Sequence, residues 1–373
     1  MGLFAQDAWE EFGAGLVKEW DGPPKPRKTK KSKKGEKEMP KEEAEQLEKE
    51  GWREVNIYEG VQEAALRGGN RVFFGPSLSN NRTYMDCVLK WSHLLAVTGA
   101  LSRFIIPELL LPLFGPIVAL PCNFYSWRCS RILFPEIRKQ TERIMQQQRR
   151  DTKSTSGDRD VGTDSEQDKE NLIDWLIRSA LASGNPAELD PHILYQRSLL
   201  LNFAAIHTLS FTLTNLLFDL ASASSNYLVE LRQEAEAVYI ANNKTWTRAA
   251  VASLHRHDSC IKETLRYWGF GGRGMMHEVM APEGVVLPDG QHLLKGAWVG
   301  VPTERVMHDE DTYERADVWE GFRFFDEREK ARKELEARAK EEGRLEDVLR
   351  ERKLGLVSTS ERFLAFGFGR DAW

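Results

Sequence analysis

Four polar side chains share one face of an otherwise apolar segment in the middle of the chain. They are Thr208, Thr212, Asn215 and Asp219, spaced at i, i+4, i+7 and i+11. This is the spacing of a single helical face. Buried hydroxyls need partners, and helical Ser and Thr commonly bond the carbonyl one turn back. Taken alone, this segment and the adjacent His207 favour a structural interpretation, a core helix whose polar groups are satisfied, over a functional one.

A second candidate is a group of opposite charges from two distant segments. Glu263 and Arg266, in the stretch K-E-T-L-R, lie at i and i+3 and can pair along a helix. On a surface such a pair means little. Arg323 stands between aromatic residues, where a buried guanidinium would need an anion. One carboxylate can accept from two guanidinium groups, so Arg323 is a candidate second partner for Glu263.

The third candidate is the glycine-rich C-terminal stretch. Phe366-Gly367-Phe368-Gly369-Arg370 predicts a hinged turn that carries one cation. Glycines at alternate positions let the backbone approach a flat or charged group closely. A plain hairpin turn that ends in a basic residue is the alternative interpretation.

The periodicity around these residues predicts mainly helices. Asn171–Ser183 is amphipathic, and Asp190-Pro191 is a helix start from which a helix of about 45 Å, buried on all sides, runs to about Ala221. Two further helices are predicted, over 227–239 and over 249–268. Short strands, 279–287 and 291–301, flank a Pro288-Asp289-Gly290 turn. The fold class is therefore mainly α with a small β region.

The composition of the chain limits the classes of protein and of partner that remain possible. The chain has 373 residues, 41% hydrophobic and 29% charged, with a net charge of -5. It can bury a large core, and its charge gives no general attraction to nucleic acid or membrane. The four cysteines form no C-x-x-C pair, which favours free thiols in a reducing compartment.

One apolar stretch is a candidate for membrane contact. Phe104–Pro121 contains Glu108 and prolines at 107, 112 and 116, each of which would break or kink a spanning helix. We therefore predict a partly buried or interfacial segment. Met1–Trp20 has no long apolar run and is neither a secretory signal nor an anchor.

Three charged stretches punctuate the chain. The basic run 23–41 could imitate a nucleic-acid patch, but it has no interleaved aromatic residue and is interpreted as a solvated linker. Residues 149–170 are interpreted as a surface loop. Residues 326–352 are rich in helix formers and predict an exposed helix with i,i+4 charge pairs.

Taken together and in order, these motifs resemble the cytochrome P-450 (haem-thiolate monooxygenase) series. The series comprises A-A-I-H-T at 204–208, Glu263-x-x-Arg266, Phe322-Arg323-Phe324 and the 366–370 turn. Together with L-R-x-E at 231–234, R-V-F-F-G at 71–75 and V-S-T-S-E-R-F at 357–363, it is similar to the fungal, membrane-associated branch near ent-kaurene oxidases.

The resemblance implies a role for each matched position. Thr208 and His207 would be catalytic, with Thr208 ordering dioxygen and its proton donors and His207 joining a proton relay. Arg370 would bind a haem propionate, Phe366 and Gly369 would face the cofactor, and His277 stands where a second propionate arginine is expected. Glu263, Arg266 and Arg323 would be the structural charge network. Phe203, Ala204 and Met275 would border the substrate pocket.

The sequence also departs from the family pattern. The motif continues to a cysteine that would stand at position 373, where this chain has Trp373 and no metal ligand. The resemblance thus implies an incomplete cytochrome P-450 fold, truncated at both ends, with haem binding in doubt. Its parts are an N-terminal segment 1–51, a core 52–325, a charged helical insertion 326–354 and the start of the haem loop, 355–373.

Two functions from different classes remain open at this point. By resemblance the protein is a haem-dependent monooxygenase of a lipophilic small molecule, with terpenoids as one candidate class, that takes electrons from an NADPH-dependent flavoprotein reductase. It would lie on the cytosolic face of the endoplasmic reticulum membrane. The missing sulfur ligand implies that the chain as written is inactive. The alternative is a non-catalytic relic that serves as an interaction scaffold, and a nucleic-acid binder is the weakest interpretation.

Overall fold

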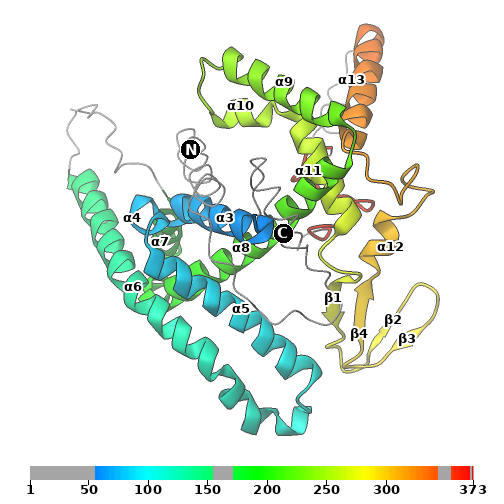
Figure 1. Cartoon of the computed structure of the whole chain (residues 1–373). Coiled ribbons are helices and arrows are strands. Elements are labelled where there is room, and N and C mark those ends of the chain that lie inside the picture. Colours follow the sequence, from blue (N-terminus) through cyan, green and yellow to red (C-terminus); the bar gives the residue numbers. More distant parts are fainter. Residues whose placement is uncertain (1–54, 154–170, 343–353, 370–371, 373) are drawn as a thin grey trace, which may run out of the picture. The chain divides into compact units, whose positions relative to one another are not determined.

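The computed structural model describes residues 55–153, 171–342, 354–369 and 372. They fall into two compact units that divide inside one long helix, with unit 1 ending at Ser210 and unit 2 beginning at Phe211. Each unit is described by itself. The helices far outnumber the strands among the described residues (Figure 1), which confirms the predicted mainly α class.

Unit 1 is a set of helices, several of which begin at asparagine caps. Its helices are α3 Ile57–Phe74, α4 Pro76–Ser79, α5 Arg82–Phe104, α6 Leu111–Lys153, α7 Leu172–Ala182 and the first part of α8 Pro191–Ser222, with short 3-10 turns at Glu108–Leu110 and Pro186–Leu189. The predicted amphipathic segment forms α7, and the Asn171 side chain caps it in a reciprocal arrangement with Asp174. Asp190 Oδ1 accepts from the His192 backbone N–H at 2.9 Å, which confirms the predicted start of α8.

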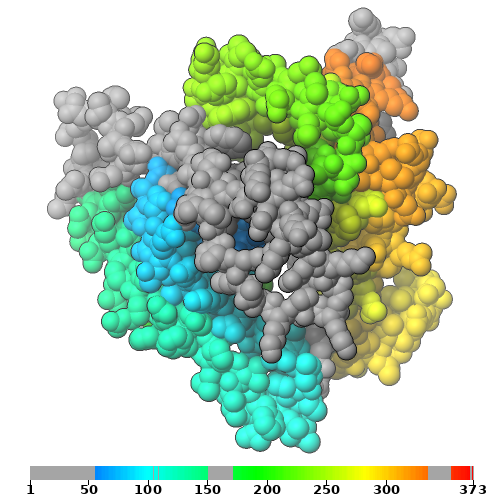
Figure 2. All heavy atoms as spheres, in the orientation of Figure 1, coloured from blue at the N-terminus to red at the C-terminus, as the bar shows by residue number. Residues whose placement is uncertain are grey.

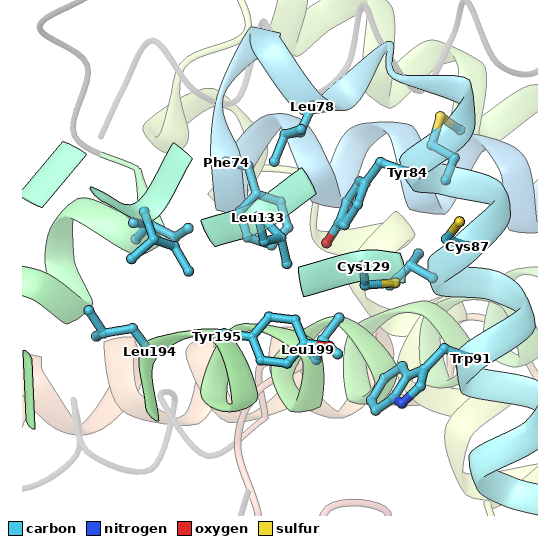
Figure 3. Close-up of a cluster of buried hydrophobic side chains, with 14 of the residues drawn as sticks. Phe74, Leu78, Tyr84, Cys87, Trp91, Cys129, Leu133, Leu194, Tyr195 and Leu199 are labelled. Carbon is cyan, nitrogen blue, oxygen red and sulfur yellow. The ribbon is translucent and has the colours of Figure 1, made fainter. Parts of the chain in front are cut away.

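The core of unit 1 lies where α8 meets the helices before it. Figure 3 shows side chains that converge from five helices. They are Phe74, Leu78, Tyr84, Cys87, Trp91, Cys129, Leu133, Leu194, Tyr195 and Leu199. A buried polar contact crosses this core, because Asn202 Nδ2 donates to both Asn70 Oδ1 and the Tyr84 hydroxyl, each at 3.0 Å. The paired amides fix how α8 sits against α3 and α5.

Helix α8 is less enclosed than its composition predicts. It is long and apolar enough to cross a membrane, although a core helix passes the same test. Its buried side chains, such as Leu194 and Ile206, lie on the face that packs in unit 1, while Leu200 is 60% exposed. The prediction of burial on all sides is therefore wrong, because the packed helices cover only one face.

The prolines near residue 110 affect the helices differently. The chain leaves α5 at Phe104 and enters α6 at Leu111, with Pro107 in the break between them. Pro116, Pro121 and Pro135 lie inside the 43-residue helix α6, so Pro116 does not end the helix. The cause is tertiary packing: α6 lies along α5 (Figure 1) and buries Cys129 and Leu133 in the core, which offsets the backbone hydrogen bonds that the prolines remove.

Unit 2 joins helices to two small sheets. It contains the end of α8, then α9 Ser225–Ala241, α10 Arg248–Ala252, α11 His255–Trp268, α12 Thr303–Met307 and α13 Arg323–Glu342. The strands are β1 Gly274–Glu278, β2 Val285–Val286, β3 His292–Leu293 and β4 Trp298–Val301. The pairs β1–β4 and β2–β3 are antiparallel. The hairpin around the 288–290 turn is confirmed, although β1 was not predicted and β4 pairs with it.

The helix predicted over 249–268 is two helices. The chain breaks at Ser253 and Leu254 between α10 and α11. The Glu234 carboxylate of α9 caps α11 by accepting from the backbone N–H groups of Arg256 at 2.9 Å and His257 at 3.2 Å. Burial alone would raise the pKa of Glu234, but these bonds and the His257 ring at 2.8 Å lower it. Sequence periodicity could not show this cap, because it comes from another helix.

The charged stretch after residue 323 forms a helix as predicted, within the part of the chain that the structure describes. α13 begins at Arg323, three residues before the predicted start, so that Arg323 belongs to its first turn. A charge pair lies on it between Glu329 and Arg332, at i,i+3 and 2.9 Å. The predicted i,i+4 pairs stay a prediction.

Candidate functional site

A buried charge network occupies the centre of unit 2. Glu263 and Arg266 are fully buried on α11, and the Arg266 guanidinium donates to both carboxylate oxygens at 2.8 Å. Arg323 Nε donates to Glu263 Oε1 at 3.1 Å, and the Glu320 backbone N–H donates to the same oxygen at 3.0 Å. The structure thus brings together the three residues that the sequence singled out, with one carboxylate shared by two guanidinium groups.

The two arginines also hold the connection between α12 and α13. Arg266 Nη1 donates to the carbonyls of Met307 at 2.7 Å and Ala316 at 2.9 Å. Arg323 Nη2 donates to the carbonyl of Val318 at 3.1 Å. The network therefore fixes the backbone of a long irregular segment whose carbonyls would otherwise need water.

A buried lysine joins the same helix to the segment after α13. Lys262 Nζ donates to the Gly355 carbonyl at 2.8 Å and lies over the rings of Phe324 and Phe363, 5.0 and 4.6 Å from their centroids. Asp258 Oδ2 accepts from the Leu356 backbone N–H at 2.8 Å. Two side chains of α11 thereby set the course of the chain into its glycine-rich end.

The charge of Lys262 gives a pH prediction. Burial lowers the pKa of Lys262 to about 8 from its usual 10.5, so between these values the unfolded chain holds more protons than the folded chain. We expect the free energy of unfolding of unit 2 to gain a contribution as pH rises from about 8 to 10.5, at most about 3 kcal/mol. Urea denaturation at several pH values should show this rise and its loss in Lys262→Met. Parallel pH profiles for the two proteins would contradict the prediction.

A hollow of about 370 Å³ lies between β1 and the glycine-rich turn of unit 2. Its lining residues are Phe270, Gly271, Arg273, Gly274, Met275, Met276, His277, Thr303, Met307, Leu364, Ala365, Phe366, Gly367 and Phe368. The rings of Phe270 and Phe366 lie 5.7 Å apart, and Gly367 adopts a φ of +81° that lets its backbone turn at the wall. The walls combine apolar side chains with a similar share of polar surface, and Arg273 and His277 are the lining residues able to carry positive charge.

The predicted site residues fall on both units. Met275, His277 and Phe366 line the hollow of unit 2, and Gly369 follows with a φ of +84°. Met275 lies in β1 at a bulge, with a φ of +52° that non-glycine residues rarely adopt. Arg370 and Trp373 lie outside the described residues.

The remaining site residues lie together on the unit 1 part of α8. The Thr208 hydroxyl donates to the Ala204 carbonyl at 2.7 Å, one turn back. The Phe203 ring packs against the His207 ring at 5.0 Å between centroids. The ring of His93, from α5, also packs against the His207 ring, with 5.5 Å between the centroids. This contact was not predicted, because nothing in the sequence links residues 93 and 207.

These motifs and their arrangement agree with a comparison of the sequence with known families. A family model described as cytochrome P450 matches residues 32–372. The chain belongs to the cytochrome P450 family. Family membership implies a haem cofactor. Arg266 of the charge network bonds the carbonyl of Met307, which lines the hollow.

Fungal cytochrome P450 proteins are similar to the chain over most of its length. Cytochrome P450 monooxygenase lnaC of Aspergillus flavus is 29% identical over 325 residues, which cover 87% of this chain and 57% of lnaC. Cytochrome P450 monooxygenase gloP of Glarea lozoyensis is 27% identical, over 86% of this chain and 56% of gloP. The chain thus spans a little over half the length of these relatives. The finer resemblance to ent-kaurene oxidases stays a prediction.

The residues of the hollow fit one face of a porphyrin. Phe270, Met275 and Phe366 present apolar surface to a flat ring, and Gly367 has no side chain that would hold such a ring away. His277 stands at the edge, where an acidic substituent would find a partner when the imidazole is protonated. Within the described ranges, no cluster of three or more His, Cys, Asp or Glu side chains could hold a metal ion.

Proposed function

We propose that this P450 chain is part of a haem-dependent monooxygenase. The reaction would be the NADPH- and O2-driven oxidation of a lipophilic small molecule, with terpenoids as a candidate class. Electrons would come from a flavoprotein reductase. The observation that carries the proposal is the buried Glu263–Arg266–Arg323 network beside the hollow, because burying three charges is costly and needs a structural reason.

Each described residue would contribute positioning or proton chemistry. The charge network would hold the α12–α13 connection, and Phe366 would pack against the cofactor, with Gly367 and Gly369 forming the turn beside it. His277, together with Arg370 outside the described residues, would pair with the haem propionates. Thr208 would hold a proton at its hydroxyl. When bound, the haem supplies oxygen activation, which no amino-acid side chain provides.

Trp373 decides whether the chain as given can act. A cysteine thiolate is the family's axial ligand, and an indole nitrogen is a donor without a free lone pair to offer iron. We infer that the chain with Trp373 does not form the haem-thiolate complex. Trp373 is the one residue that favours the alternative function, a non-catalytic scaffold, because it offers no ligand to the haem iron.

Reduced-CO difference spectra of haem-loaded protein test the proposal. We expect no thiolate-type band from the chain as given and a clear band from Trp373→Cys, because the new sulfur would stand at the end of the glycine-rich turn. Trp175→Cys is the matched control, since it adds a thiol on the exposed face of α7. A thiolate band from Trp175→Cys but not from Trp373→Cys would refute the assignment of the site. A folded Trp373→Cys chain that takes up no haem would favour the scaffold.

We also propose that the protein lies on the cytosolic face of the endoplasmic reticulum membrane. The support is a group of exposed apolar side chains where α5 turns into α6, here called the apolar tip. Its members are Ile105, Leu109, Leu110, Leu113, Phe114, Ile117 and Leu120. Contiguous exposed apolar surface of this kind is typical of a membrane or protein contact.

A further inference from the structure

Two histidines meet inside unit 1, although 113 positions separate them in the sequence. His93 comes from α5 and His207 from α8; their ring centroids are 5.5 Å apart and their planes are tilted by 48°. Gln62 of α3 brings its Nε2 atom to 3.5 Å from His93 Nε2. Three helices therefore build an imidazole pair with an amide beside it.

One ring nitrogen of the pair is buried without a partner. Nε2 of His207 makes no hydrogen bond among the described residues. An unpaired buried polar atom costs about 1–3 kcal/mol, so a protein does not keep one without compensation. A proton shared with a neighbouring ring, directly or through one water molecule, would satisfy this atom.

The electrostatics of the pair favour a single proton. Burial lowers the pKa of His207, and the neighbouring His93 lowers it further. Two imidazolium rings at this distance repel each other, so the second proton binds only at a lower pH than the first. A proton on His93 therefore disfavours a proton on His207, which is the coupling that a proton-sharing pair requires.

The other ionisable groups on these helices have contacts of their own. Glu63, next to Gln62 on α3, pairs with Arg67 at 3.7 Å. Lys90 of α5, three residues before His93, lies over the Tyr125 ring at 5.7 Å from its centroid. On α8 itself, the apolar ring of Phe203 contacts the His207 ring. The titratable group nearest to Gln62 is the Tyr58 hydroxyl, which accepts from Gln62 Nε2 at 3.4 Å.

Gln62 is placed to influence the tautomer of His93. If its amide nitrogen donates across the 3.5 Å to His93 Nε2, the neutral ring accepts there and carries its own proton on Nδ1. When His93 is protonated, Nε2 becomes a donor, and a turn of the Gln62 amide would present its oxygen instead. The Gln62 amide can therefore form a hydrogen bond with either the neutral or the protonated His93 ring.

We propose that His93 and His207 form a proton-sharing pair that stores one proton beside the Thr208 hydroxyl, with Gln62 as its positioning residue. The use of this proton in oxygen chemistry rests on the proposed function, whereas the existence of the pair does not. His207 directly precedes Thr208 on α8, and the Thr208 hydroxyl is held by the Ala204 carbonyl at 2.7 Å in the same turn.

Nitrogen-15 NMR of histidine-labelled full chain, without haem, tests the pair. His93→Gln should raise the pKa of His207 by about half a pH unit or more, the effect of a like charge at that distance even in a water-like medium. Gln62→Leu should change the ratio of His93 tautomers while both rings still titrate. An unchanged His207 titration in His93→Gln would overturn the proposal.

A control and a second measurement keep the test decisive. His292→Gln, in β3 of unit 2, should leave the His207 titration unchanged. If His93→Gln fails to fold, the titration curves of the unchanged chain test the pair instead. A coupled pair gives broadened two-step curves, and independent rings give simple one-step curves. Failure of the haem spectra with Trp373→Cys would refute the monooxygenase proposal and leave the pair standing. Simple, independent titrations would refute the pair and leave the monooxygenase proposal standing.

Discussion

Glu263→Gln is expected to lower the free energy of unfolding of unit 2 by about 3–5 kcal/mol, the usual cost of removing one partner from a buried ion pair. The carboxylate has no solvent exposure and accepts from Arg266, Arg323 and the Glu320 backbone N–H. Glutamine keeps the shape and one oxygen but leaves two guanidinium groups buried without a counter-charge. Urea denaturation and hydrogen exchange of α11 peptides would measure the loss.

Glu320→Gln is the matched control for this experiment. Glu320 also pairs with Arg323, at 3.1 Å, but its side chain is 32% exposed, so water can replace the lost charge. We expect a cost below about 1 kcal/mol. In addition, Glu263→Gln combined with Arg266→Gln should cost less than the sum of the two single changes, because each alone strands the other partner. Equal costs for Glu263→Gln and Glu320→Gln would show that burial does not govern the network.

Local signals predicted the helices well and their tertiary adjustments poorly. The start of α8 followed from the capping residue Asp190, which acts within one turn of the chain, and α7 followed from its amphipathic spacing. The break between α10 and α11 depends on Glu234, which reaches α11 from another helix. Likewise, Pro116 stays inside α6 because packing in unit 1 outweighs its local preference.

For the candidate site too, contacts with a local signal were predicted and contacts between distant segments were mostly not. The Glu263–Arg266 pair follows from i,i+3 spacing on one helix, and Arg323 was linked to it by its apolar surroundings. The anchoring of the 355–356 backbone by Lys262 and Asp258 could not be predicted, because the partners are backbone groups almost a hundred residues away. The contact of His93 with His207 was missed for the same reason. The roles of these residues toward haem stay predictions.

The apolar tip is expected to bind lipid bilayers. Leu109 is 90% exposed, Leu113 64% and Ile117 58%, and burying one such side chain is worth about 1.5–3 kcal/mol. Figure 2 shows the tip, in cyan, at the lower end of the visible face, open to contact. The seven side chains of the tip all lie within sixteen positions and none is charged or polar, which favours the hydrocarbon boundary of a membrane over a specific polar partner.

Flotation with neutral phosphatidylcholine vesicles measures this contact. We expect the full chain to float with the vesicles, and Leu109→Asp combined with Leu113→Asp and Ile117→Asp to lower the partition at least about a hundredfold, because three buried apolar groups are lost and three charges are added. The control is Leu228→Asp with Val229→Asp and Ile240→Asp, apolar residues of α9 that are also more than half exposed, and it should float like the unchanged chain.

Salt and light scattering separate the competing explanations of such binding. Apolar insertion is insensitive to salt, whereas attraction through the basic run 23–41 would require anionic lipid and would fall with ionic strength. Binding that disappears in salt, or that survives the three changes in the tip, would therefore refute the tip as the membrane contact. Light scattering without vesicles should show the same particle mass for the unchanged chain and the tip variant. If the unchanged chain is a dimer and the tip variant is a monomer, the tip binds a second copy of the chain. Such an interface would leave no apolar surface for lipid and would refute the membrane contact.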